Sequence, residues 1–263
     1  MLRSVDATIP ICVTTRWQTQ VMTNPWVNGE LLAFDLETTG VDKARDIPVS
    51  YALVWFCDQA PERHDAGIIN PGIAIPEGAT AVHGITTERA VAEGVDLESG
   101  VRHIIEALLD ASRRGVPVVG FNLSYDLSMM DARLRALDGT GLVEAGWHGP
   151  VLDPLVMDRS LERYRKGKRT LDLVCKRYGV VNEAAHDASG DAIASAKVLF
   201  AMATTYSAQL GDIDAATLTR SQVGWHRTWA EGMDEFLRTK GGSGFDPDDF
   251  DWPLSGGHAK VAL

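Results

Sequence analysis

The segment LLAFDLETTG, residues 31–40, is the strongest indication of the fold class, because an apolar run ends there in two acidic side chains. Residues 31–35 are typical of a short buried strand. Asp35 and Glu37 stand two positions apart, and the period of two in a strand points both side chains to one face. Two carboxylates at a buried strand end are costly unless a divalent cation compensates them. The alternative is a solvated acidic pair where the strand enters a loop.

Two further strands are expected after this one, at residues 47–56 and 63–70, and their short connections predict antiparallel pairing. A Pro- and Gly-rich loop follows them. The next segment has the apolar spacing of an amphipathic helix that Gly115 ends. Its apolar positions are Val101, Ile104, Ile105, Leu108 and Leu109.

Strands and helices alternate in the second half of the domain. Strands are expected at residues 116–121 and 151–153. Helices are expected after an N-cap at Ser124, near residues 155–163, from Thr170 to Gly179, and at residues 189–206. This order predicts an α/β fold with a five-stranded mixed sheet flanked by helices.

Three more polar residues interrupt these elements where chemistry is possible. Asp126 lies in the first turn of its helix, where an aspartate also has a capping role. His186 is expected on the loop before the last of these helices, with Asp191 in its first turn. Taken alone, each has an ordinary structural reading.

Taken together, the acidic residues and the histidine resemble the DEDDh branch of the 3′→5′ exonucleases, over roughly residues 30–207. FDLETTG (34–40) resembles the first family motif, GFNLSYD (120–126) the second and HDASGDA (186–192) the third. The segment INPGIAIPEGATAVHGIT (69–86) is similar to the loop that carries the HGIT sequence. Phe121 and Tyr125 depart from the residues common in relatives, but neither is a metal ligand. The resemblance implies a ribonuclease H-like fold.

The resemblance also implies a two-metal phosphodiester hydrolysis with two Mg²⁺ ions, for which Mn²⁺ can substitute. Asp35 would bridge both ions, Glu37 and Asp191 would hold the ion that carries the attacking water, and Asp126 would support the second ion. His186 would be the general base, since histidine exchanges protons near neutral pH. The implied product is a nucleoside 5′-monophosphate released from the 3′ end of DNA, and single-stranded DNA is the expected form.

The expected substrate contacts fall in four segments. The turn after the first strand and the HGIT loop are expected to approach the terminal nucleotide, because the family uses them so. The segment RSLERYRKGKR, residues 159–169, has six basic residues and one acid, and it predicts a backbone-binding patch or a solvated loop. The candidate residues are Thr38, Thr39, Gly40, His83, Gly84, Ile85, Asn122, Tyr125, Arg165, Lys166, Lys168 and Arg169.

Four regions are expected: an N-terminal extension (1–28), the exonuclease domain (29–209), a helical extension (210–240) and a flexible tail (241–263). Trp225, Trp229 and Phe236 favour a core-facing stripe on the extension, with a docking helix for a DNA polymerase subunit as the alternative. Residues 241–263 are rich in Gly, Pro and Asp, which is typical of extended chain.

Composition bounds the function of the 263-residue chain. Its net charge of −11 argues against non-specific coating of DNA by the whole surface. The three cysteines form no CxxC pair, which argues against a structural zinc site. No segment is long enough for a membrane span, and the amino terminus is a weak match to a signal peptide, so a cytoplasmic protein is expected. The open alternatives are an RNA-trimming exoribonuclease of the same family and a non-catalytic nucleic-acid-binding protein.

Overall fold

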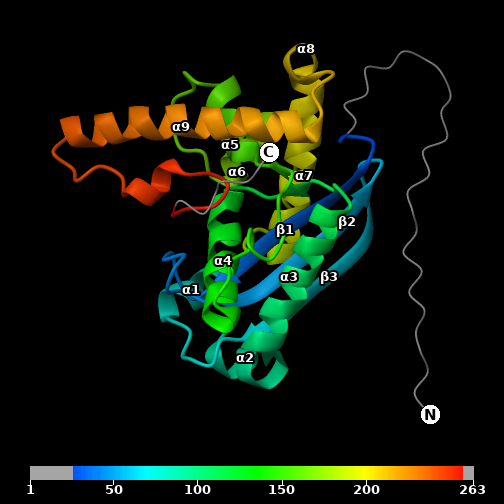
Figure 1. Cartoon of the computed structure of the whole chain (residues 1–263), viewed down its shortest axis with the longest axis vertical. Coiled ribbons are helices and arrows are strands. Elements are labelled where there is room, and N and C mark those ends of the chain that lie inside the picture. Colours follow the sequence, from blue (N-terminus) through cyan, green and yellow to red (C-terminus); the bar gives the residue numbers. More distant parts are fainter. Residues whose placement is uncertain (1–25, 257–263) are drawn as a thin grey trace.

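A computed structural model describes residues 26–256, and a mixed β-sheet lies at its centre (Figure 1). The strands are β1 (Glu30–Thr38), β2 (Pro48–Cys57), β3 (Ala60–Asn70), β4 (Val95–Asp96), β5 (Val118–Val119) and β6 (Val151–Leu152). Their order across the sheet is β4-β3-β2-β1-β5-β6. β1, β2 and β3 pair antiparallel, whereas β5 pairs parallel with β1 and β6 parallel with β5. The carboxyl ends of β1, β5 and β6 therefore lie at one edge.

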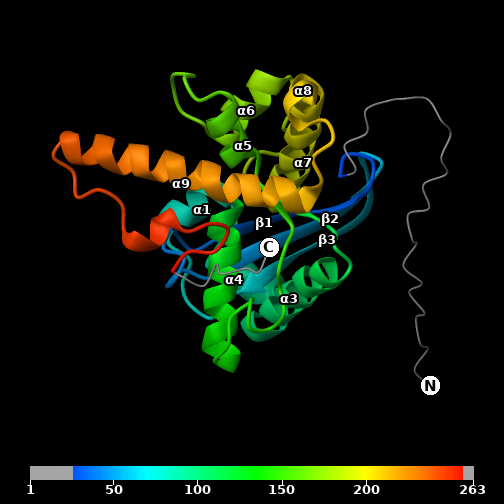
Figure 2. The ribbon, with the colours of Figure 1, turned by 45° about the horizontal axis from the view of Figure 1, so that its top comes forward.

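The helices are α1 (Glu77–His83), α2 (Thr87–Glu93), α3 (Leu97–Arg113), α4 (Leu123–Asp138), α5 (Pro154–Leu161), α6 (Leu171–Tyr178), α7 (Ala188–Thr205), α8 (Ser207–Leu210) and α9 (Ala215–Thr239). α3 and α7 lie on opposite sides of the sheet (Figure 2). Side chains of β1 point alternately to the two faces of the sheet, and each face is covered by helices. Leu32, Phe34 and Leu36 pack with α3 and α4, whereas Leu31 and Ala33 pack with α7.

The predicted α/β fold is confirmed, with one correction in the strand count. The sheet has six strands and not five among residues 26–256, because the two residues of β4 add to the free edge of β3. The loop after β3 also contains the short helices α1 and α2, which were not predicted. α4 begins at Leu123 after Asn122 as N-cap, so the prediction of Ser124 as N-cap is wrong.

The helix predicted as a C-terminal extension is built into the sheet edge. β6 leaves backbone groups without a neighbouring strand, and side chains of α9 bond to them. The Thr219 hydroxyl accepts from the Val151 N–H, and the Gln222 amide accepts from the Asp153 N–H at 2.7 Å and donates to the Val151 carbonyl at 2.9 Å. α9 therefore replaces the hydrogen bonds of a missing strand.

Of the segment predicted as a flexible tail, 241–263, the structure describes residues 241–256, and part of it packs on the domain. A 3₁₀ helix, Pro247–Phe250, leads to Trp252 and Leu254, which are 2% and 0% exposed and pack in the core beside α4. Gly, Pro and Asp make this segment irregular, but its two large apolar side chains fix it to the domain. Of the predicted N-terminal extension, residues 1–25 lie outside the described residues. Trp26 is buried and donates to the Ile213 carbonyl.

Within residues 26–256, no helix combines the length and the apolar character that a bilayer crossing requires.

Candidate active site

β1 delivers the first two carboxylates to the carboxyl edge of the sheet. Its odd-numbered side chains point toward α7, so Asp35 and Glu37 continue the row that Leu31 and Ala33 begin. α7 begins immediately opposite, with Asp187 as N-cap, and places Asp191 in its first turn. Carboxylate oxygens of Asp35, Glu37 and Asp191 all lie within 4.8 Å of one another. Oxygen ligands at this spacing suit a hard divalent cation.

Asp126 reaches the same place from the other side of the sheet. It lies in the first turn of α4, is 4% exposed, and is the strongest of the acidic neighbours that act on Asp35. It stands outside the group of three whose oxygens converge within 4.8 Å. Asp126 is thus a fourth carboxylate beside Asp35, placed to serve a second ion or the far side of a shared one.

The electrostatics of this cluster favour protonation in the absence of a cation. Burial, and then the charges of Asp126, Asp191 and Glu37, raise the pKa of Asp35 well above its ordinary value. Burial and the charge of Asp191 raise the pKa of Glu37 to about 7. Burial also raises the pKa of Asp126 and of Asp191. Four carboxylates that repel one another in a partly dry site require positive charge to ionise together.

His186 lies at the open side of the cluster, on the loop before α7. It is exposed, has φ 64°, and its backbone N–H points to Asp191 Oδ2 at 3.4 Å. A charge on its imidazole lowers the pKa of Asp191, so the ring lies close to the acidic group. The loop therefore presents a histidine to solvent beside the carboxylates, where a water molecule has access.

The turn after β1 is tied to α4 by Tyr125. The Tyr125 hydroxyl lies 3.0 Å from Thr38 Oγ1 and donates to the Gly40 carbonyl. Burial raises the pKa of Tyr125 to about 12, so the hydroxyl stays protonated as a donor. These bonds fix the turn next to Asp126, while Asn122 lies exposed at the start of α4 with φ 63°.

Asp46 holds the same turn from the other side. The Thr39 hydroxyl donates to Asp46 and accepts from the Ile47 N–H, and Thr39 is 3% exposed. A Cβ at Gly40 would lie 2.5 Å from the Asp46 carboxylate, so a larger residue there would displace the side chain that holds the turn. The Thr39 side chain is thus committed to the turn.

The HGIT loop also reaches the end of β1. His83 ends α1, and Gly84 follows with φ 73° as its C-cap. His83 Nδ1 accepts from the Ile85 N–H, and its Nε2 is buried with no hydrogen bond that meets the geometric criteria among the described residues. Burial lowers the pKa of His83, and the backbone of Thr38 opposes this shift. Ile85 is 6% exposed in a small apolar cluster with Val49 and Ile75, so its side chain serves packing.

The basic segment divides into paired and unpaired side chains. Arg165 and Arg169 both pair with the fully buried Asp158, with Arg169 Nε at 2.8 Å from it. Their guanidinium groups therefore neutralise an internal acid. Lys166 and Lys168 are exposed.

Asp153 was missed as a site residue by the sequence reasoning. Asp153 directly follows the apolar strand β6, as Asp35 follows the apolar residues 31–34 of β1. An acidic residue directly after an apolar run is the signal that could have identified it. Its carboxylate accepts from the backbone N–H groups of Asn122, Leu123 and Leu155. Burial raises its pKa to about 6. Asp153 therefore fixes the start of α4, and with it the position of Asp126.

Comparisons with known proteins agree with this geometry. Residues 32–199 match a family model described as Exonuclease. The chain is 29% identical over 175 residues to a DNA polymerase III PolC-type of Lacticaseibacillus paracasei, covering 66% of this chain and 11% of that protein. It is 31% identical over 172 residues to a DNA polymerase III subunit epsilon-like protein of Rhodobacter capsulatus, covering 63% and 22%. The chain thus spans less than a quarter of either relative.

A solved structure shares the fold. The zinc-bound form of the E. coli Exonuclease I complex with single-stranded DNA superposes with a TM-score of 0.58 at 19% identity. The match covers 78% of this chain and 45% of that one. At this identity the likeness supports the fold alone, and it agrees with the predicted ribonuclease H-like architecture.

Proposed function

Because the chain belongs to the exonuclease family, as its sequence motifs predicted, we propose that it is a metal-dependent 3′→5′ exonuclease that acts on DNA with a free 3′ end. The products would be nucleoside 5′-monophosphates. The observation that carries the proposal is the convergence of Asp35, Glu37 and Asp191 within 4.8 Å, with the buried Asp126 beside Asp35.

The donor set fits divalent cations. The cluster offers four carboxylates, and every charged neighbour that raises the pKa of Asp35 is itself a carboxylate. Asp35, Glu37 and Asp191 would hold one Mg²⁺ and Asp35 and Asp126 a second, with Mn²⁺ as a substitute. When bound, the ions supply positive charge that favours a nucleophilic hydroxide and stabilises the leaving 3′ oxygen.

His186 would act as the general base in this reaction. Its exposed imidazole lies beside Asp191 at the open side of the cluster, where it would take the proton from the attacking water. The loop conformation, with φ 64° at His186 and its N–H toward Asp191, supports this placement.

The turn after β1 and the HGIT loop would bind the terminal nucleotide. Thr38, His83, Asn122 and Tyr125 surround the carboxylates and would contact its sugar and phosphate, with Gly40 and Gly84 allowing close approach. The buried, unpartnered Nε2 of His83 supports this role. The exposed Lys166 and Lys168 would attract the backbone of the strand, while Arg165 and Arg169 are held by Asp158.

DNA is favoured over RNA because both relatives carry the name of DNA polymerase III and the similar solved structure holds single-stranded DNA. We further propose proofreading or repair as the process, a DNA polymerase subunit as a partner, and the cytoplasm as the compartment. The bacterial origin of both polymerase relatives supports this assignment.

The test uses a 5′-labelled single-stranded DNA oligomer and its RNA counterpart with Mg²⁺, Mn²⁺ or EDTA. We expect a ladder that shortens from the 3′ end of DNA, that EDTA abolishes, and that Asp35→Ala and His186→Ala lose. Asp212→Asn, at an exposed aspartate, is the matched control. Faster digestion of RNA would favour the exoribonuclease, and no digestion of either strand would overturn the proposal.

A further inference from the structure

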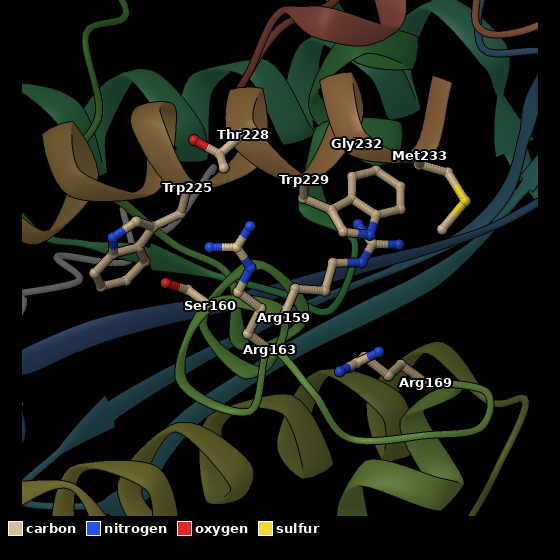
Figure 3. A pocket seen from close by; sticks show the side chains of 9 residues that line it. All are labelled: Arg159, Ser160, Arg163, Arg169, Trp225, Thr228, Trp229, Gly232 and Met233. Carbon is tan, nitrogen blue, oxygen red and sulfur yellow. The ribbon is translucent and has the colours of Figure 1, made fainter. Parts of the chain in front are cut away.

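A cavity of about 420 Å³ lies between α5 and α9. Arg159 and Arg163 reach into it from α5 and the turn after it, and Trp225 and Trp229 reach into it from α9 (Figure 3). Arg169 lines one end (Figure 3). α9 falls outside residues 32–199, so the family match does not extend to this wall of the cavity.

Arginine side chains give the cavity a positive charge, which favours binding of an anion. Over residues 26–256 the structure gives Arg159 and Arg163 no ion pair, whereas Arg165 and Arg169 in the same basic segment both pair with Asp158. Burial lowers the pKa of Arg159 to about 10, so it remains charged at neutral pH. The charges of Asp153 and Asp158 act on Arg159 from beyond ion-pair distance, so a phosphate group in the cavity would add bidentate hydrogen bonds that neither carboxylate makes.

The aromatic side chains suit a nucleobase. Arg159 Cζ lies 3.4 Å from the ring centroid of Trp229, so a flat guanidinium stacks on a flat indole. Trp225 is half-buried on the same face of α9, one helical turn earlier. Indole and guanidinium planes are the surfaces on which single-stranded bases stack.

The cavity adjoins the candidate active site. α5 follows β6, whose carboxyl end lies two strands from that of β1, which is about 10 Å across the sheet. A second cavity of about 280 Å³ is lined by Asn122 and Tyr125 and shares Arg159 and Trp229 with the first. The stacked Arg159–Trp229 pair is therefore common to the α5–α9 cavity and to the cavity lined by Asn122 and Tyr125.

We propose that the α5–α9 cavity is a subsite for a nucleotide of the bound single strand, upstream of the terminal nucleotide that is cleaved. Arg159 and Arg163 bind its phosphate, and Trp225 and Trp229 stack with its base. The inference rests on the proposed function for the direction of the strand. It assigns to α9 a part in binding the substrate.

The first experiment measures binding of a 5′-fluorescein-labelled dT12 oligonucleotide to the full chain in EDTA, where cleavage does not occur. We expect Arg163→Gln to weaken binding about tenfold and Arg159→Gln at least as much. Each substitution should also make the negative slope of the logarithm of the association constant against the logarithm of the salt concentration shallower by about 0.7. This is the value for one phosphate contact on a single strand. Arg220→Gln, at an exposed arginine of α9 outside the cavity, is the matched control and should bind as wild type.

Arg163 is exposed, so its variant tests the subsite without disturbing the core. Equal affinity and equal salt slope in Arg163→Gln and Arg220→Gln would overturn the proposal. Quenching of tryptophan fluorescence by unlabelled dT12, reduced in Trp229→Phe, would support it.

The second experiment separates this inference from the proposed function. It compares kcat/KM for dT12 with kcat/KM for the p-nitrophenyl ester of dTMP, which reaches only the cleavage site. The ratio of kcat/KM for dT12 to kcat/KM for the ester should fall about tenfold in Arg163→Gln and stay constant in Arg220→Gln. Failure of wild type to hydrolyse either substrate contradicts the proposed function, while the binding experiment in EDTA still tests the subsite. An unchanged ratio in Arg163→Gln contradicts the subsite alone.

Discussion

The charge of Asp35 is unfavourable in the metal-free protein, because this carboxylate is buried and faces Asp126, Asp191 and Glu37. We expect Asp35→Asn to abolish exonuclease activity, by at least about 10³-fold for a lost metal ligand and charge. The same change should raise the melting temperature in EDTA at pH 8, since it removes the repulsion. Calorimetry checks this against Asp212→Asn, at an exposed aspartate, which should change neither activity nor melting temperature. A lower melting temperature for Asp35→Asn would contradict the argument.

The pH dependence of stability follows from the raised pKa of these carboxylates. Glu37 has a pKa of about 7 in the folded chain against an ordinary value of 4.5. Between these values the folded chain binds more protons than the unfolded chain, so stability falls as pH rises. Glu37, which is partly exposed, contributes about 1–2 kcal/mol after allowance for solvent screening. In EDTA we expect the free energy of unfolding to fall from pH 5 to pH 8.

Two comparisons test the source of that fall. Glu37→Gln should flatten the dependence on pH, and Mg²⁺ should stabilise the wild-type protein more at pH 8 than at pH 5, because it binds the ionised form. Denaturant titrations at each pH measure both effects. If the free energy of unfolding of Glu37→Gln falls by the same amount from pH 5 to pH 8, the fall comes from groups other than Glu37.

At the scale of single elements, the Tyr125 hydroxyl joins α4 to the turn after β1. Tyr125 bonds to Thr38 and to the Gly40 carbonyl, so Tyr125→Phe should cost about 1 kcal/mol of stability. We expect a larger effect on catalysis, with kcat/KM about tenfold lower, because the turn beside the carboxylates gains freedom. Tyr164→Phe, at an 88% exposed tyrosine, is the control. An unchanged kcat/KM would show that the turn is positioned by Asp46 alone.

α9 and β6 form a second pair of elements that depend on side-chain bonds. Gln222 is fully buried and satisfies backbone groups of Val151 and Asp153. Gln222→Leu should lower the free energy of unfolding by about 2–4 kcal/mol, because it leaves a buried donor and acceptor unpaired. The matched change Gln209→Leu, at an exposed site on α8, should cost less than about 0.5 kcal/mol. Denaturant titration distinguishes them, and equal costs would contradict the role of α9.

At the scale of the whole molecule, the segment after α9 closes the core. Trp252 is 2% exposed and Leu254 is fully buried. Trp252→Ala should cost about 3–5 kcal/mol, the usual loss for a large buried aromatic side chain. Phe236→Ala, which truncates a 53% exposed aromatic on α9, should cost less than about 1 kcal/mol. A Trp252→Ala variant as stable as wild type would show that the segment leaves the core in solution.

In the basic segment, residues 159–169, the composition did not predict which arginine side chains are paired. Its composition predicted a patch with Arg165 and Arg169 as members, yet both neutralise the buried Asp158. Arg159 and Arg163, in the same eleven residues, make no ion pair within residues 26–256 and line the cavity beside α9. Composition gives the number of basic side chains, but which of them reach Asp158 and which face α9 depends on how the segment folds.

The sequence by itself determined the family, the α/β order of elements and the local positions of Asp35, Glu37, Asp126, His186 and Asp191. Those features depend on periods of two or four residues and on short motifs, which the chain carries locally. Only the tertiary structure decided that α9 completes the edge of β6, that Trp252 is buried and that Arg159 stacks on Trp229. Each of these is a contact between segments about 70 to 130 residues apart, such as Asp153 with Gln222 and Ser128 with Ser255. No local pattern encodes such a contact, because its free energy exists only once both segments have packed.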